Sequence, residues 1–199
     1  MDKMPRRAWL PFLTRDVPAE CDTPAKLAAF ELKIACDHFS KPAPTLREDA
    51  AMGEAYAFGD GVIAGGPTGL LYGVYAYVQA LAAGEPFPTG EQRPFYSLRM
   101  IDCWDNADGT VERGYAGRSL WFEGGRLSWD DGRIRQLGRM LASVGLNALC
   151  VNNVNVRAEA ALLIEDYLPD LTRLAAVLRP FGVRLMASVD FYRRYLFPW

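Results

Sequence analysis

Hydrophobic residues recur at helical spacing in two segments near the start of the chain. The first segment runs from Thr23 to about His38, and its apolar residues are Leu27, Phe30 and Ile34. A proline directly after the threonine is typical of a helix start, and a proline-rich stretch follows the segment. The pattern therefore predicts a helix there.

The second segment begins at Thr68, which is expected to cap a helix that ends near Gly84. Its apolar face comprises Leu71, Val74, Tyr75, Val78 and Leu81. Before it, residues 54–58 and 62–64 flank a Gly-Asp-Gly turn and predict a short hairpin. Residues 1–92 are therefore expected to form an α+β domain, with two helices against one β-rich sheet.

A stretch rich in proline and glycine at 86–94 predicts a linker, after which the pattern changes. Three short apolar strands are expected, at 97–101, 148–151 and 183–189. Two helices alternate with them, at 134–145 and 168–180, and a long polar loop is expected at 102–131. Strands that alternate with helices in this way form parallel sheets with right-handed crossovers.

Polar and aromatic residues follow each of the three expected strands. They are Asp102, Trp104, Asp105 and Asn106 after the first, Asn152, Asn153 and Asn155 after the second, and Asp190 after the third. Ligands of α/β sheets and barrels bind at the carboxyl ends of the strands, which favours a binding site here. Asparagine and aspartate also cap turns, and this alternative is favoured for the asparagine run alone.

Composition and charge narrow the class of protein. The chain has 199 residues, half of them apolar, and 22 basic against 24 acidic residues give a net charge of −2. This balance argues against a dedicated nucleic-acid-binding protein. The longest apolar run, 70–83, is too short to span a membrane, and the first residues lack the pattern of a signal peptide. A cytoplasmic protein is expected.

Tests for common catalytic and cofactor motifs give no match. The four cysteines are dispersed and are expected to be free thiols. The single histidine, His38, has no metal-ligand spacing around it, and the glycines at 65–69 lack the lysine of a phosphate loop. No metal and no cofactor are expected.

Several segments together resemble one enzyme family. The segments are RMIDCWDN at 99–106, DGTVERGYAGR at 108–118, MLASVGLN at 140–147, VNNVN at 151–155 and RPFGVR at 179–184. They resemble the region where the catalytic barrel of α-glucuronidases of glycoside hydrolase family 67 begins. Upstream, GLLYGVY at 69–75 is similar to a helix opening in the N-terminal domain of that family. The resemblance covers nearly the whole chain.

The resemblance implies an accessory α+β domain at 1–92, followed at 93–199 by the first three βα units of an incomplete TIM (β/α)8 barrel. It also implies a reaction. The family hydrolyses the α-1,2 bond between (4-O-methyl-)glucuronic acid and xylose in xylooligosaccharides, as in xylan degradation. The reaction inverts the anomeric centre, with an acid and a base carboxyl group about 6.5–9.5 Å apart.

The resemblance further implies a set of substrate-binding residues: Trp104, Asp105, Asn106, Arg113, Asn153 and Val154. Trp104 matches a tryptophan that contacts the sugar, and Val154 matches a neighbouring wall residue. The guanidinium of Arg113 can bind the substrate carboxylate in a bidentate way. Alternatively Arg113 holds its loop together through Glu112, and this second role is favoured.

The chain departs from the family pattern at several points. Cys103 stands where the family usually has histidine, and residues 190–199 differ from the family pattern after the third strand. The catalytic carboxylates of the family come from later barrel strands. The chain is therefore expected to be an N-terminal portion, inactive alone, with a frameshift or premature stop favoured over a natural split. Decorated xylooligosaccharides are the expected partners, and a homodimer is expected only for the full-length protein.

Two alternatives of other classes stay open. The chain could be a carbohydrate-binding module whose aromatic platform comprises Trp104, Tyr115, Trp121 and Trp129. It could also be an α/β subunit that a partner chain completes.

Overall fold

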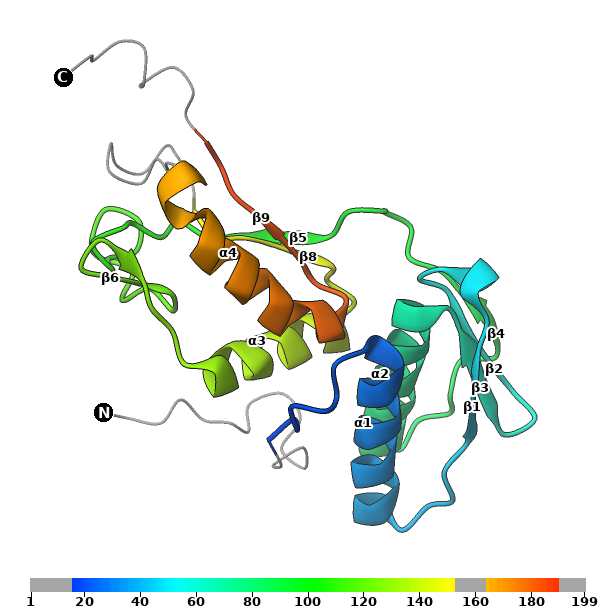
Figure 1. Ribbon diagram of the computed structural model, residues 1–199. Helices are drawn as coiled ribbons and strands as arrows, with labels where there is room; N and C mark the ends of the chain where they lie inside the picture. Colours follow the sequence, from blue (N-terminus) through cyan, green and yellow to red (C-terminus); the bar gives the residue numbers. More distant parts are fainter. Residues whose placement is uncertain (1–15, 153–163, 190–199) are drawn as a thin grey trace, which may run out of the picture.

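The computed structural model describes residues 16–152 and 164–189. Figure 1 shows two sheets with helices, one in each half of the chain. Of the predicted site residues, Asn153 and Val154 lie outside the described residues, as do Asn155 and Asp190. None of the helices in the described ranges is both long and apolar enough to cross a lipid bilayer.

The first half contains a four-stranded sheet with two helices packed against each other. Its helices are α1 (Pro24–Phe39) and α2 (Pro67–Ala83), with a short 3₁₀ helix at Ala50–Met52. Its strands are β1 (Thr45–Glu48), β2 (Tyr56–Gly59), β3 (Val62–Gly65) and β4 (Gly90–Gln92), in the order β1-β3-β2-β4. The predicted helices and hairpin are confirmed, and the side chain of Thr23 caps α1 by accepting a hydrogen bond from the backbone N–H of Lys26.

Three details of this half differ from the sequence prediction. β1 was not predicted, and the expected linker contributes β4, which pairs with β2 in antiparallel fashion. Both strands are short and largely exposed, so they show no hydrophobic alternation. The N-cap of α2 is Gly66 and not Thr68, because Pro67 occupies the first turn. A side chain at Gly66 would clash, since its Cβ would lie 2.1 Å from the carbonyl oxygen of Gly53.

The second half confirms the predicted β–α–β–α–β order. Its elements are β5 (Met100–Asp102), α3 (Asp131–Ser143), β8 (Ala148–Cys150), α4 (Ile164–Leu178), a 3₁₀ turn η3 (Arg179–Phe181) and β9 (Arg184–Met186). The three strands are parallel and lie in the order β5-β8-β9. Figure 1 shows α3 and α4 on the same side of this sheet.

Two predictions in this half were wrong in detail. α4 begins at Ile164 rather than Leu168, so that Pro169 lies inside the helix. Burial of Leu171, Leu174 and Leu178 against the core stabilises the helix despite the hydrogen bond that a proline cannot donate. The expected polar loop contains a hairpin of β6 (Phe122–Glu123) and β7 (Arg126–Leu127), and its apolar residues are buried.

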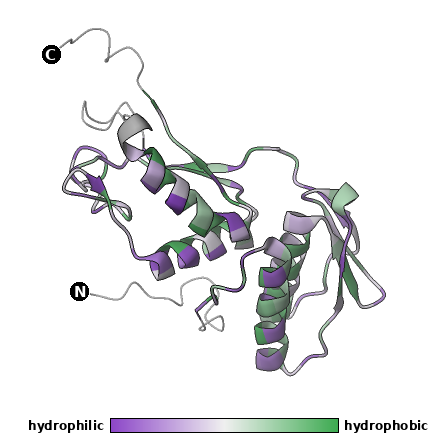
Figure 2. Cartoon of the chain, in the orientation of Figure 1, coloured by the Kyte–Doolittle hydropathy of each residue, from purple (hydrophilic) through white to green (hydrophobic). Residues whose placement is uncertain are grey.

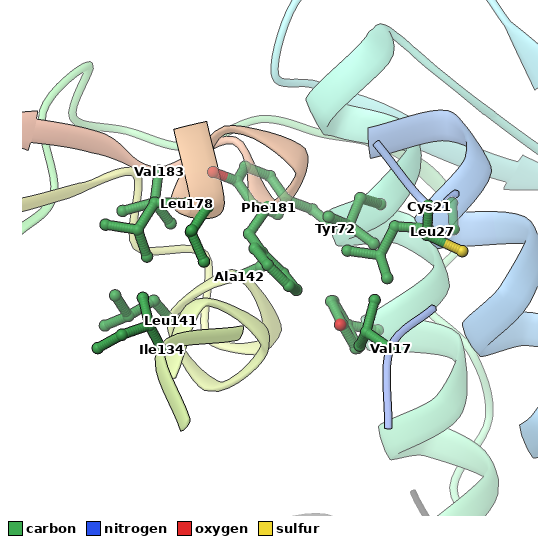
Figure 3. Close-up of a cluster of buried hydrophobic side chains, with 14 of the residues drawn as sticks. Val17, Cys21, Leu27, Tyr72, Ile134, Leu141, Ala142, Leu178, Phe181 and Val183 are labelled. Atoms are coloured by element: carbon green, nitrogen blue, oxygen red, sulfur yellow. The ribbon is translucent and has the colours of Figure 1, made fainter. Parts of the chain in front are cut away.

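One hydrophobic core runs through both halves. Figure 3 shows Leu27 of α1 and Tyr72 of α2 facing Ala142 of α3 and Phe181 of η3. In Figure 2, α3 and α4 carry bands of hydrophilic and hydrophobic positions, as expected for helices with one buried face. The proposed domain boundary between residues 92 and 93 stays a prediction.

Candidate functional site

The carboxyl end of β5 carries three consecutive residues in different environments. Trp104 is 41% exposed, whereas Asp105 and Asn106 are buried, at 5% and 1% exposure. All three belong to the segment 104–122, which we call the Trp104 loop. The loop therefore presents the tryptophan ring to solvent. The two buried polar side chains make hydrogen bonds within the loop.

Asp105 binds the far end of the Trp104 loop. Its carboxylate accepts hydrogen bonds from the Ser119 hydroxyl and the Leu120 backbone N–H. Burial raises the pKa of Asp105, and these two hydrogen bonds partly oppose that rise. The Ser119 hydroxyl oxygen also accepts from the backbone N–H groups of Trp121 and Phe122, at 3.2 and 2.9 Å.

Asn106 closes the near end of the same loop. Its Nδ2 donates to the Thr110 hydroxyl at 2.9 Å and to the Glu112 carbonyl at 2.6 Å. Because a carbonyl can only accept, these contacts fix which end of the amide is nitrogen. The buried Oδ1 atom has no hydrogen-bond partner in the described ranges.

The loop doubles back so that Trp104 lies opposite Glu112. Asp105 and Val111 form an antiparallel bridge, and the Glu112 backbone N–H donates to the Trp104 carbonyl at 2.6 Å. The Tyr115 hydroxyl donates to the Glu112 carboxylate, and this hydrogen bond raises the pKa of Tyr115. Arg113 is exposed between them in sequence. An indole, a carboxylate, a phenol and a guanidinium therefore come from one short loop.

The segments that follow β8 and β9 are hydrogen-bonded to each other. Asn152 is fully buried and pairs with the backbone of Ser188 in both directions, at 3.0 and 3.1 Å. This pairing favours the structural role for Asn152 over a ligand role. The Cys150 thiol lies 3.5 Å from the Ser188 hydroxyl.

Cys103 stands between β5 and Trp104, where the resembling family usually has histidine. Its backbone N–H donates to the Cys150 carbonyl at 3.0 Å, which continues the pairing of β5 with β8. Burial raises the pKa of the Cys103 thiol to about 12, and the nearby carboxylate of Asp105 adds to the rise. The thiol is therefore neutral at physiological pH, and all four cysteines of the chain are free.

In the part of the chain that the structure describes, α3 and α4 cover one face of the sheet β5-β8-β9. Ile101, Leu149 and Leu185 pack into the core on this helix side. Met100 and Met186 alternate with them on the other face, and each is 40% exposed. Ala148 and Cys150 of the central strand lie on that same face but are buried, so that it is exposed only at its outer strands.

Two surface hollows lie away from the Trp104 loop. One, of about 400 Å³, is lined by residues that include Tyr72, Gln79, Arg93 and Arg99; we call it the Arg99 hollow. It lies at the amino ends of β5 and β8, where Arg99 pairs with Glu54 at 3.0 Å. The other lies beside α1 and β1. Neither of these two hollows is lined by residues of the Trp104 loop.

Of the four residues in the predicted aromatic platform, Trp121 cannot belong to an exposed surface. Trp121 is 1% exposed, and its indole N–H donates to the Val151 carbonyl at 2.9 Å, so it anchors the loop to the end of β8. Trp129 is half-buried and packs under the Arg173 guanidinium, 4.2 Å from the ring centre. Trp104 and Tyr115 are exposed, at 41% and 71%.

Comparison with known proteins shows that the Trp104 loop lies in a region that matches a protein family. The model of the glycosyl hydrolase family 67 middle domain matches residues 84–195, which is more than half of the chain. The chain belongs to glycosyl hydrolase family 67. The resemblance seen in the sequence is thereby confirmed, and the matched range includes the whole Trp104 loop.

Relatives of this family 67 chain carry one name. A probable alpha-glucuronidase A of Aspergillus oryzae is 37% identical over 165 residues, which are 81% of this chain and 19% of the relative. A probable alpha-glucuronidase A of Neosartorya fischeri is 42% identical over 127 residues, 62% of this chain and 14% of the relative. The chain thus spans about a fifth or less of the length of these relatives.

A solved structure has a similar fold. A GH138 enzyme targeting pectin rhamnogalacturonan II superposes with a TM-score of 0.56 at 15% identity, covering 87% of this chain and 30% of that one. At this identity the likeness concerns the fold alone.

The construction of the family 67 loop could not be predicted from the polar residues that follow β5. Ser119 and Trp121 hold it together from positions that the sequence pattern placed in an undivided polar loop. The left-handed backbone of Glu112, with φ of 56°, was also unforeseen. Of the predicted site residues, Trp104, Asp105, Asn106 and Arg113 come together in one loop, and their substrate-binding role stays a prediction.

Proposed function

We propose that this chain forms part of the substrate site of an α-glucuronidase, with the Trp104 loop as its sugar-binding surface. The reaction is hydrolysis, with inversion, of the α-1,2 bond between (4-O-methyl-)glucuronic acid and xylose in xylooligosaccharides. One observation carries the proposal: the region that matches the family presents an exposed tryptophan at the carboxyl end of a parallel strand.

The residue roles follow from their environments. The exposed face of Trp104 suits the apolar face of a pyranose ring. Asp105 and Asn106 contribute by holding the loop, since their side chains bind its other residues. We assign Arg113, which is exposed, to the uronic acid carboxylate, because a guanidinium can bind a carboxylate in a bidentate way. Asn153 and Val154 stay predicted substrate-binding residues and lie outside the described residues.

The topology of the second half supports an incomplete TIM barrel as its architecture. Its strands lie side by side in chain order, and both connecting helices are on one face. A doubly wound sheet would place helices on both faces. In a barrel the helix-free face points inward, and the active site forms at the carboxyl ends of the strands. Residues 93–199 are thus proposed as the start of the catalytic barrel.

We further propose that the acid and base carboxyl groups are not among the residues of this chain. Asp105, the carboxylate closest in sequence to Trp104, is buried and bonded within the loop. The chain is then expected to bind the substrate without turning it over.

The test is calorimetric titration of the purified chain with xylotriose that carries one α-1,2-linked glucuronic acid. Saturable binding is expected, with no release of glucuronic acid. Trp104→Ala should weaken binding at least tenfold, because stacking on the ring is lost. Tyr96→Ala removes another exposed aromatic ring, 66% exposed and before β5, and should leave binding unchanged. Equal binding by the Trp104→Ala variant would refute the proposed surface, and turnover would refute the proposed absence of the carboxyl pair.

A further inference from the structure

Glu112 has an unusual backbone conformation for its residue type. In the described ranges, the non-glycine residues with positive φ are Ser40, Asp60 and Glu112, at 51°, 50° and 56°. Ser40 terminates α1, and Asp60 opens the two-residue turn between β2 and β3, where left-handed residues are common. Glu112 is the first central residue of a β-turn that the Gly114 N–H closes by donating to the Val111 carbonyl at 3.0 Å. With a positive φ this position is usually occupied by glycine, asparagine or aspartate, and not by glutamate.

The contacts that hold the Glu112 backbone do not use its side chain. Its N–H donates to the Trp104 carbonyl and its carbonyl accepts from Asn106 Nδ2, both at 2.6 Å. Glycine could make both hydrogen bonds without the steric cost that a Cβ atom has in this conformation. Glutamate at position 112 has a steric cost that glycine would avoid, which indicates that its side chain has a function.

Glu112 lies directly across the loop from Trp104. The bridge between Asp105 and Val111 and the hydrogen bond from the Glu112 N–H to the Trp104 carbonyl place the two residues opposite each other. The Tyr115 hydroxyl donates to the carboxylate and so orients it. A carboxylate has about four acceptor positions, so that this single donor leaves others open.

We propose that Glu112 is a ligand-binding residue whose carboxylate accepts hydrogen bonds from hydroxyl groups of a sugar ring stacked on Trp104. The proposal rests on the proposed function of the Trp104 loop. Because two carboxylates repel each other, Glu112 binds ring hydroxyls and not the acid group of a uronic acid. Sugar hydroxyls that donate to a charged acceptor form the stronger class of hydrogen bond.

The experiment compares two variants of Glu112 by calorimetry with the same glucuronic-acid-decorated xylotriose. Glu112→Gln keeps the size of the side chain and removes its charge, and Glu112→Gly removes the side chain and relieves the backbone. Both are expected to weaken binding about tenfold or more. The melting temperature of Glu112→Gly should be no lower than that of the wild type and up to about 2–4 °C higher. Binding would then be lost without loss of folding.

Asp60→Gly is the matched control. It relieves the same backbone conformation in the turn between β2 and β3, far from the Trp104 loop in sequence, and should leave binding unchanged. Wild-type affinity in both Glu112 variants, with binding lost in Trp104→Ala, would overturn the role of Glu112 and leave the proposed surface intact. Absence of saturable binding by the unsubstituted chain would contradict the proposed function itself, and with it this inference.

Discussion

Trp104, Asp105 and Asn106 are adjacent in sequence but differ in exposure and in role. The indole is exposed, while the carboxyl and the amide beside it are buried and bonded to the loop that follows. Polar residues after a strand predict a binding site in this region, and that role stays a prediction. Which of them face solvent depended on how residues 107–122 fold back, and no local pattern in the sequence reports that.

The buried thiol of Cys103 makes stability depend on pH in alkaline solution. Its pKa is about 12 in the folded chain and 9.0 for an unperturbed thiol, so the unfolded chain releases the proton first. Between these values the folded state binds more protons, and stability falls as pH rises.

We therefore expect the stability advantage of the wild type over Cys103→Ala to shrink between pH 9 and pH 11. Urea denaturation of both proteins across this range measures it, and the tyrosines cancel in the difference because both proteins contain them. An advantage that stays constant or grows with pH would show that the thiol is not held protonated.

Among the elements, the parallel strands are shorter than their apolar runs. The side chain of Asn147 accounts for the short β5, because its Oδ1 accepts from the Arg99 N–H and its Nδ2 donates to the Ser97 carbonyl. A side chain thus replaces strand pairing before Met100. The hydrophobic pattern could predict the strand. It could not predict these side-chain hydrogen bonds, because they join residues about 50 positions apart in the sequence.

The packing of α3 on η3 depends on the absence of a side chain at Gly138. A Cβ atom there would lie 2.5 Å from Cδ2 of Phe181, a fully buried ring. Gly138→Ala should therefore destabilise the protein by about 1–3 kcal/mol, although alanine favours helices.

Chemical denaturation measures this cost, with Gly132→Ala in the first turn of α3 as the control. The nearest atom to a Cβ at Gly132 is a carboxylate oxygen of Asp130 at 3.1 Å, on a side chain at the exposed N-cap. Greater stability in Gly138→Ala than in the wild type would show that the ring does not pack against this glycine.

Helices were easier to predict than edge strands in this chain. α1, α2 and α3 each carry a long apolar stripe and a clear start or stop, and their predicted positions are confirmed. β1 and β4 have three or four residues each and become strands through pairing with β3 and β2. Such pairing is a property of the assembled sheet and leaves no periodicity in a three-residue segment.

At the scale of the whole molecule, a buried ion pair joins the two halves. Glu31 of α1 and Arg139 of α3 are both fully buried, and Arg139 donates to both carboxylate oxygens, at 2.5 and 2.8 Å. The Tyr75 hydroxyl of α2 donates to the same carboxylate at 3.1 Å. Burial lowers the pKa of Arg139, but its contacts with Glu31 outweigh this and leave the pKa raised.

Removing one partner of this pair should be costly, because the other charge would remain buried. Glu31→Gln is expected to lower the free energy of unfolding by about 3–5 kcal/mol. The double variant Glu31→Leu with Arg139→Met replaces both charges by apolar groups of similar size and should recover most of the loss. A loss below about 1 kcal/mol in Glu31→Gln, measured by urea denaturation, would refute the importance of the pair.

Amide NMR during titration with the decorated xylotriose tests whether the Trp104 loop binds a uronic-acid-decorated xylooligosaccharide. We expect saturable chemical-shift changes at the Trp104 indole and at the amides of residues 112–115. Residues around the Arg99 hollow should not shift. No saturable shifts, or shifts confined to the Arg99 hollow, would show that the Trp104 loop is not the binding surface.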